Sequence, residues 1–393
     1  MRDTSASAGS GFWDRFVRPP PPDQSSRTWH ISPAIDVIAY HFSWALLLVP
    51  LVMLAGNNQH RDYAIVFVMV LGVNFAHRHY GFPYAYLDGD VFRLHRVKLL
   101  WFPLAAGALF LLTPWFTDGS FLDIGKTNGR LVIAGMVLFS VLWNFWHTYM
   151  QKFGIMRIYM AKDEAPPERK TPPWVDKLFL FCWFPLYFAW VGPRYKNLIY
   201  QNAPSMRRAI RPVIQFLETN QALMMTPGVI LAAAGVGLWF WHEWRAHRLR
   251  NPARMSMGLA MLLLSTSLFW INPVKVYISF AFSHAVEYMV FVWAFQRRRY
   301  HEPARPEAAP SLMARLVARP VLFYGSITFV LLIIPAIEYG WGAWFTPPVP
   351  RVTIAGVSGS NWFLMYAVYQ SMVHFYMDGF LWKIRRPEVI ANL

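Results

Sequence analysis

The sequence contains a single cysteine, Cys182, among 393 residues. One thiol cannot form an intrachain disulfide or build a thiolate metal cluster. Any metal bound by this chain would therefore rely on His, Asp, Glu or water. The sequence also lacks the HExxH spacing of zinc hydrolases, a glycine-rich nucleotide-binding loop, a nucleophilic serine turn and a glycosidase-like carboxylate pair.

Charged residues are scarce as well. They make up 15% of the chain, whereas about a quarter is usual in soluble domains. Hydrophobic residues account for 55% and aromatic residues for 17%. The formal charge is +16, but Lys and Arg flank apolar segments instead of forming a stripe on a polar domain. This distribution is typical of a membrane protein, and we expect no nucleic-acid partner.

The apolar segments predict an all-α fold, a polytopic integral membrane bundle of about ten transmembrane helices. A spanning helix needs about 20 mostly apolar residues. Basic residues, Lys152 and Arg254 among them, are frequent in every second connection, so both termini are predicted to be cytoplasmic. Connection 194–225 breaks this pattern, either as an interfacial amphipathic segment or because a neighbouring span is misplaced. The predicted spans are 33–55, 62–80, 98–116, 130–150, 177–193, 226–244, 256–272, 275–296, 319–339 and 361–382.

Three regions are expected along the chain. Residues 1–32 form a disordered, Pro-rich cytoplasmic tail without the apolar region of a signal peptide. Residues 33–385 form a single transmembrane helical domain, and residues 386–393 form a C-terminal tail. The expected location is a multi-pass position in a membrane of the bacterial inner-membrane type.

Several ionisable residues fall inside the predicted spans, where charge is costly and each such group calls for an explanation. His284 and Glu287 are three residues apart, and His374 and Asp378 are four apart. On a helix either spacing places both side chains on one face. Each pair can ligate an ion together, or the carboxylate can orient the imidazole.

Depth in the bilayer groups further histidines with these pairs. His41, His77, His147 and His374 fall in the cytoplasmic half of their spans, and His284 falls near the midplane. His79 can converge with His77 only if the helix ends there, as Gly81 and Pro83 indicate. The loop YLDGDVFRLHR follows. The candidate metal ligands are therefore His41, His77, His79, Asp88, His95, His147, His284, Glu287, His374 and Asp378.

A purely structural interpretation remains open for each candidate. A His–carboxylate pair can be a neutralised buried pair that locks two helices. An isolated His near a helix end can make an interhelical hydrogen bond. Asp88 and Asp90 can form an Asx turn, and Glu243 is expected to lie at the membrane interface with its charge in water.

The favoured hypothesis is a metal-dependent membrane oxidoreductase, such as a hydroxylase, desaturase or oxygenase. Imidazole and carboxylate ligands suit iron, copper, manganese or zinc; iron is favoured, at one or two ions. Glu287 and Asp378 are the expected catalytic carboxylates, as bridging ligand or base. The expected partners are membrane lipid, a hydrophobic substrate at the cytoplasmic leaflet and an electron-donor protein. The HxxxH and HxxHH boxes of membrane desaturases are absent, so no family is assigned.

Three other functions stay open at this point. Two histidines among His41, His147, His284 and His374 could bind a haem as axial ligands. The same polar residues could form the relay of a proton- or ion-coupled transporter, which would require polar groups in both leaflets. A zinc hydrolase could use a carboxylate as general base.

Overall fold

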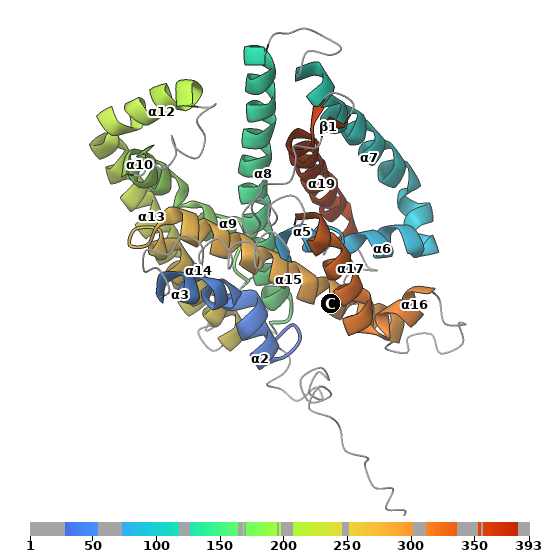
Figure 1. Cartoon of the computed structure of the whole chain (residues 1–393). Helices are drawn as coiled ribbons and strands as arrows, with labels where there is room; N and C mark the ends of the chain where they lie inside the picture. The colour runs from blue at the N-terminus through green and yellow to red at the C-terminus, as the bar shows by residue number, and fades with distance from the viewer. Residues whose placement is uncertain are drawn as a thin grey trace, which may run out of the picture.

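In a computed structural model, the described residues are almost all helical (Figure 1). It describes residues 28–53, 73–117, 126–163, 168, 170–194, 196–197, 207–245, 251–301, 312–335, 353–354 and 357–383. Within these residues the only strands are β1 (Thr353–Ile354) and β2 (Val357–Ser358), which pair antiparallel. The predicted all-α class is confirmed. The expected tails, apart from residues 28–32, and most of span 62–80 lie outside the described residues.

The described helices follow the chain in this order: α2 (Pro33–Ile35), the π-helix η2 (Asp36–His41), α3 (Ser43–Met53), α5 (Val73–His77), α6 (Gly81–Leu87), α7 (Gly89–Thr117), α8 (Lys126–Ala161), α9 (Pro173–Phe181), α10 (Phe184–Arg194), α12 (Arg207–Thr219), α13 (Gln221–Arg245), α14 (Pro252–Ser267), α15 (Pro273–His301), α16 (Leu312–Val317), α17 (Pro320–Pro335) and α19 (Gly359–Leu381). The longest, α8, has 36 residues and is about 54 Å long at 1.5 Å per residue.

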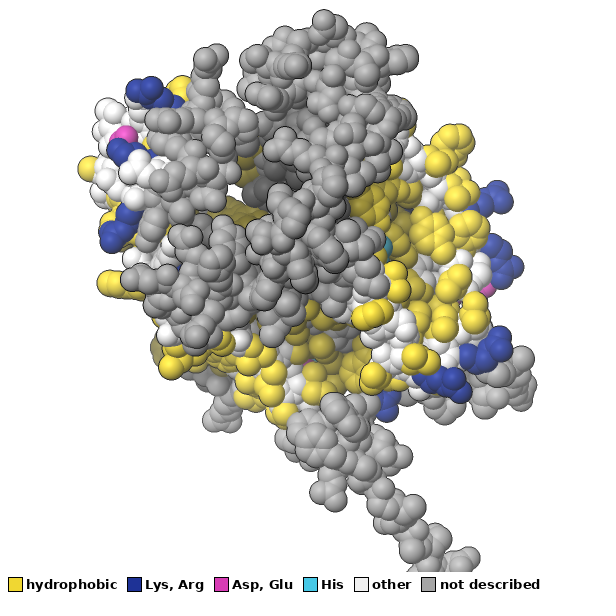
Figure 2. All heavy atoms as spheres, in the orientation of Figure 1, with side chains coloured by type: hydrophobic (Ala, Val, Ile, Leu, Met, Phe, Trp, Pro, Cys, Tyr) yellow, Lys and Arg dark blue, Asp and Glu magenta, His cyan; other side chains and the backbone are white. Residues whose placement is uncertain are grey.

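Four helical segments are long and apolar enough to cross a membrane: Gly89–Thr113, Pro173–Arg194, Gln221–Arg245 and Lys275–Tyr300. The pair Pro33–His41 and Ser43–Met53, bent by 56°, would add a fifth. Large apolar side chains such as Leu94, Trp101 and Leu104 are exposed on α7. Figure 2 shows hydrophobic side chains over much of that flank. A surface of this kind is suited to lipid, so the chain has the character of a membrane protein.

Helix α15 lies at the centre of the packing and contacts η2, α3, α5, α8, α14 and α16. Helix α19 packs against α6, α7 and α8. The helices α9, α10, α12 and α13 pack against one another on the other side of α8 (Figure 1). Helices α5, α8, α15 and α19 therefore approach one another in the middle of the described bundle.

Buried ion pairs connect helices that are distant in the sequence. Arg254 is fully buried, with Nη2 2.5 Å from Asp176 Oδ1 and Nε 2.8 Å from Glu243 Oε1. The indole of Trp239 also donates to Asp176. The expectation that Glu243 reaches water is wrong, because its side chain is fully buried against Arg254. Arg254 is likewise an interior cation and not a loop charge, since two distant carboxylates compensate it.

Candidate metal centre

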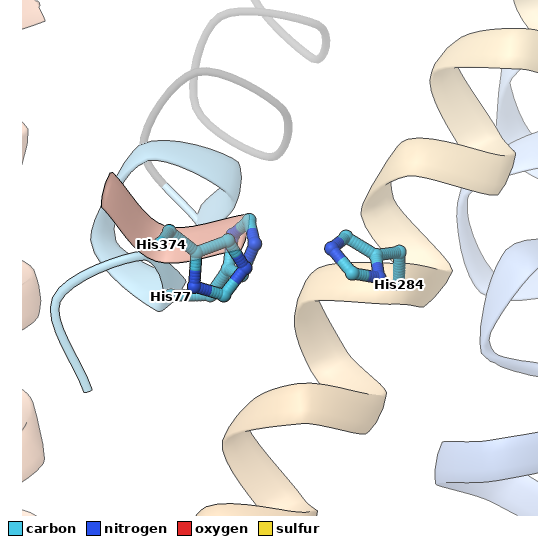
Figure 3. Close-up of side chains that lie close together, drawn as sticks. All are labelled: His77, His284 and His374. Carbon is cyan, nitrogen blue, oxygen red and sulfur yellow. The ribbon is translucent and has the colours of Figure 1, made fainter. Parts of the chain in front are cut away.

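Four histidines from four helices meet in the middle of the bundle. His77 is the last residue of α5, His147 lies on α8, His284 on α15 and His374 on α19. The His77 ring centroid lies 4.8 Å from that of His284 and 4.9 Å from that of His374. The His147 centroid lies 5.0 Å and 5.2 Å from the same two rings. Figure 3 shows His77 and His374 side by side, facing His284 across the helix interface.

These four side chains, which we call the histidine cluster, are buried, and most of their ring nitrogens have no hydrogen-bond partner among the described residues. Their exposure is 8% for His147 and at most 1% for the others. Six of their ring nitrogens have no hydrogen-bond partner among the described residues: both nitrogens of His77 and His284, and Nε2 of His147 and His374. Each unsatisfied buried group costs about 1–3 kcal/mol, so six such groups would cost on the order of 10 kcal/mol. This cost is comparable to the whole free energy of unfolding of a domain. The cluster calls for a ligand that satisfies it.

The nitrogens are close enough for a metal ion. One group comprises His77, His284 and His374, and a second comprises His147, His374 and Asp378. Within each group the donor atoms lie within 4.8 Å of one another. Metal–nitrogen bonds are about 2.0–2.1 Å long, so two ligands of one ion are at most about 4 Å apart, and these side chains would move inward by about 1 Å to bind it. The donor set and its spacing fit a transition metal.

Asp378 is held by two donors while its other oxygen faces the cluster. Its Oδ1 accepts from the Tyr288 hydroxyl at 2.9 Å and from the Trp382 indole at 3.0 Å. Its Oδ2 lies 3.5 Å from Nε2 of both His147 and His374. A carboxylate oriented in this way can ligate an ion or accept an imidazole N–H. The four-residue spacing of His374 and Asp378 therefore brings both to one place.

Glu287 points to a different partner. Its carboxylate accepts from Lys152 and Ser283, and from Gln151 Nε2 at 3.2 Å. Neither Lys152 nor Glu287 has an exposed side chain, and Glu287 is in neither candidate metal group. Lys152, predicted as a loop cation, lies inside α8. Because a buried carboxylate requires compensation, this lysine draws Glu287 away from the histidine cluster.

Two further predicted ligands near the cluster are held elsewhere. Helix α5 ends at His77 and a new helix begins at Gly81, so His79 lies in the turn between them. Its Nδ1 contacts the carbonyl of Phe75 at 3.1 Å. His41 bonds the hydroxyls of Ser256 and Tyr159, each at 2.9 Å. Neither is part of the candidate metal groups in the described residues.

Asp88 and His95 also lie outside those groups. Asp88 accepts from the backbone amides of Asp90 and Val91 at the start of α7, and from Arg299 and Tyr300. Burial alone would raise its pKa, but Tyr300, the Val91 amide and Arg299 together hold the pKa of Asp88 below its ordinary value. The ring of His95 packs 4.8 Å from that of Phe380. Asp88 thus begins a helix, as the Asx-turn alternative foresaw.

Sequence reasoning did not single out Lys152, Gln151, Tyr288 or Trp382. Lys152 and Gln151 directly follow the apolar run of α8, where the predicted span was drawn too short. Tyr288 follows Glu287, and Trp382 lies four residues after Asp378. This spacing places Trp382 beside that carboxylate and is a signal that could have found it.

Comparison with family models, with curated proteins and with solved structures gives no match. The fold and the site alone therefore define the class: a helical protein with membrane-length apolar helices and buried His/Asp groups able to hold a metal ion.

Proposed function

We propose that this protein is an integral membrane oxidoreductase whose transition-metal centre is held by His77, His147, His284, His374 and Asp378. The observation that carries the proposal is the histidine cluster, with six buried ring nitrogens that lack hydrogen bonds within the described residues. A purely structural cluster would bear that free-energy cost without compensation. Metal ligation removes it and ties four helices together.

Iron is the metal we favour. The ligands are imidazole and carboxylate, which suit iron, copper, manganese and zinc. His374 belongs to both candidate groups, so it could complete a metal site with His77 and His284 or with His147 and Asp378. When bound, iron would supply the redox chemistry needed to oxidise an unactivated carbon with dioxygen.

The chain's own side chains would hold the proposed metal ligands and neighbouring carboxylates in place. Tyr288 and Trp382 fix Asp378, which presents one oxygen to His147 and His374. Glu287 forms a buried ion pair with Lys152, which compensates its charge and holds α15 against α8 beside the proposed centre. Hydroxylation of a C–H bond by dioxygen gives an alcohol and water, and consumes two electrons and two protons. An electron-donor protein would supply the electrons.

The topology we propose has about ten spans with both termini in the cytoplasm of a bacterial-type cell. Helices lie over the described parts of all the predicted spans, and the Arg297–Arg299 run stands at the end of α15. His284 lies about nine residues, or roughly 14 Å, into the candidate span Lys275–Tyr300. This depth along the helix supports a centre inside the bilayer, within reach of a hydrophobic substrate.

Ring spacing favours a metal ion over a haem. A haem needs two imidazoles that face each other across a macrocycle. In the histidine cluster each of two rings is instead about 5 Å from two others, in edge-on contact. Four imidazoles so close together match the coordination of an ion.

Metal analysis of the purified protein tests the proposal. We expect stoichiometric iron in the wild type and its loss in His284→Ala and His374→Ala, each with oxidation activity abolished and membrane insertion retained. His242→Ala on α13, outside the candidate metal groups, is the matched control and should keep its metal. A wild-type protein free of iron, copper, manganese and zinc after metal-supplemented expression would refute the proposal. So would full metal content in both cluster variants.

A further inference from the structure

A cavity of about 260 Å³ lies between α8, α15 and α19, beside the histidine cluster. His147 and Asp378 line the cavity and also form part of a candidate metal group. His147 is more than nine-tenths buried, and its Nε2 atom has no hydrogen-bond partner in the described part of the chain. A molecule in this cavity would lie against the proposed metal ligands.

Apart from His147, the ionisable and amide side chains that line the cavity already have partners within the bundle. Glu287 accepts from Lys152, Ser283 and Gln151. Tyr288 and Trp382 direct their donors to Asp378. These groups gain nothing from a charged or strongly polar ligand, which would in turn lose its hydration. The cavity is therefore suited to an uncharged occupant.

The remaining walls are apolar, and two glycines leave space between them. A Cβ added at Gly154 on α8 or at Gly379 on α19 would meet no atom of the described residues within 4 Å. The volume is just below the usual range of ligand pockets, about 300–1,000 Å³, so the cavity accommodates only part of a long molecule. The apolar wall residues are Trp146, Met150, Ile155, Ile158, Phe291 and Phe375.

The edge of the cavity reaches the apolar outer surface of the bundle. Trp146 is 47% exposed although it lines the cavity, and Gly379 is exposed as well. Phe139, Leu142 and Trp143, which lie on α8 with Trp146, are also exposed. A surface of this composition faces lipid chains in a bilayer, so a molecule can enter sideways from the membrane.

We propose that this cavity binds a segment of the hydrocarbon chain of a membrane lipid, which enters between α8 and α19 and lies against His147 and Asp378. This inference rests on the proposed function and names its substrate class. It assigns Gly154 and Gly379 the role of keeping the space open. It also makes an unactivated carbon of the chain, rather than an ester or phosphate headgroup, the part next to the metal ligands.

Photolabelling in lipid nanodiscs tests this inference without depending on activity. The probe is a phosphatidylcholine with a diazirine in its acyl chain, compared with a free diazirine-bearing alkane. Labelled residues are located by mass spectrometry. Gly154→Leu fills the cavity, and Gly237→Leu on α13, where an added Cβ also meets nothing, is the matched control. Both changes favour a helix to a similar degree, so they differ mainly in the cavity.

We expect the phospholipid probe to label Ile158 or Phe375 in the wild type and in Gly237→Leu. In Gly154→Leu this labelling should fall about tenfold, which corresponds to a loss of about 1.4 kcal/mol in binding. Equal labelling in Gly154→Leu would overturn the inference, and labelling of these residues by the free alkane alone would overturn the lipid chain as occupant. Metal content measured on the same samples keeps the tests separate, because labelling can succeed in a protein without metal.

Discussion

The buried pair of Lys152 and Glu287 provides a quantitative test of how α8 is held against α15. Neither side chain is exposed. If Lys152 is replaced by Met, the carboxylate keeps only Ser283 and Gln151 as donors. Removal of one partner of a buried ion pair costs about 3–5 kcal/mol. Because two neutral donors remain, we expect the free energy of unfolding to fall by about 3 kcal/mol, at the lower end of that range.

A double variant isolates the interaction from the loss of either residue. Lys152→Met combined with Glu287→Met removes both charges, and apolar replacement of a buried pair is often neutral or stabilising. We therefore expect the double variant to recover most of the loss. Arg93→Met is the exposed control, because Arg93 and Asp90 are 79% and 76% exposed and such pairs contribute about 0–1 kcal/mol.

The assay is reversible unfolding in mixed micelles, followed by circular dichroism, with metal content measured in parallel. Metal should stay bound in all these variants, since Glu287 is in neither candidate metal group. A loss below about 1 kcal/mol in Lys152→Met would refute the reasoning. A double variant no more stable than the Lys152 single variant would refute it too, because the charges would then not be coupled.

Two further predictions concern Asp378 and Asp88. Tyr288→Phe removes a donor that orients Asp378, so metal affinity should fall about 10–100-fold in a chelator titration while the protein stays folded; unchanged affinity would contradict this positioning role. Asp88→Asn keeps the helix cap but loses the charge that faces Arg299 and Tyr300, so stability near pH 7 should fall by about 1 kcal/mol. The pKa of Asp88 is lowered in the folded state, so the stability difference between the wild type and Asp88→Asn is fully present above the ordinary pKa of Asp. It disappears as the pH falls through the folded-state pKa. A stability difference that persists in acid would contradict this role of the Asp88 charge.

Helix spacing and membrane depth recovered part of the candidate site from sequence. The spacing of His374 and Asp378 brings these two side chains together, and depth grouped His77, His147, His284 and His374. Depth also grouped His41, which instead bonds Ser256 and Tyr159. Depth is a single coordinate along the bilayer normal, whereas a ligand must also lie at the right angle around its helix. That angle depends on packing between helices far apart in the sequence.

The residue that the Glu287 carboxylate contacts could not be predicted from local spacing either, because it depends on packing between distant helices. Glu287 is on the same face of α15 as His284, but Lys152 of α8 determines where its carboxylate bonds. In the sequence Lys152 resembles a loop cation because it follows an apolar run and precedes other basic residues. Arg254 also resembles a loop cation in the sequence, although Asp176 and Glu243 compensate its charge inside the bundle. Charge pairing in an interior is a tertiary property.

The buried ion pairs and the histidine cluster differ in whether the described side chains satisfy them. Lys152 and Arg254 are compensated by carboxylates, so stability accounts for them. Unpartnered polar atoms also occur singly among the described residues, on Trp44 and Gln370 for example. In the described part of the chain, six such atoms lie together only in the histidine cluster. Helix packing alone does not offset that free-energy cost, whereas ligation of the proposed metal ion would offset it.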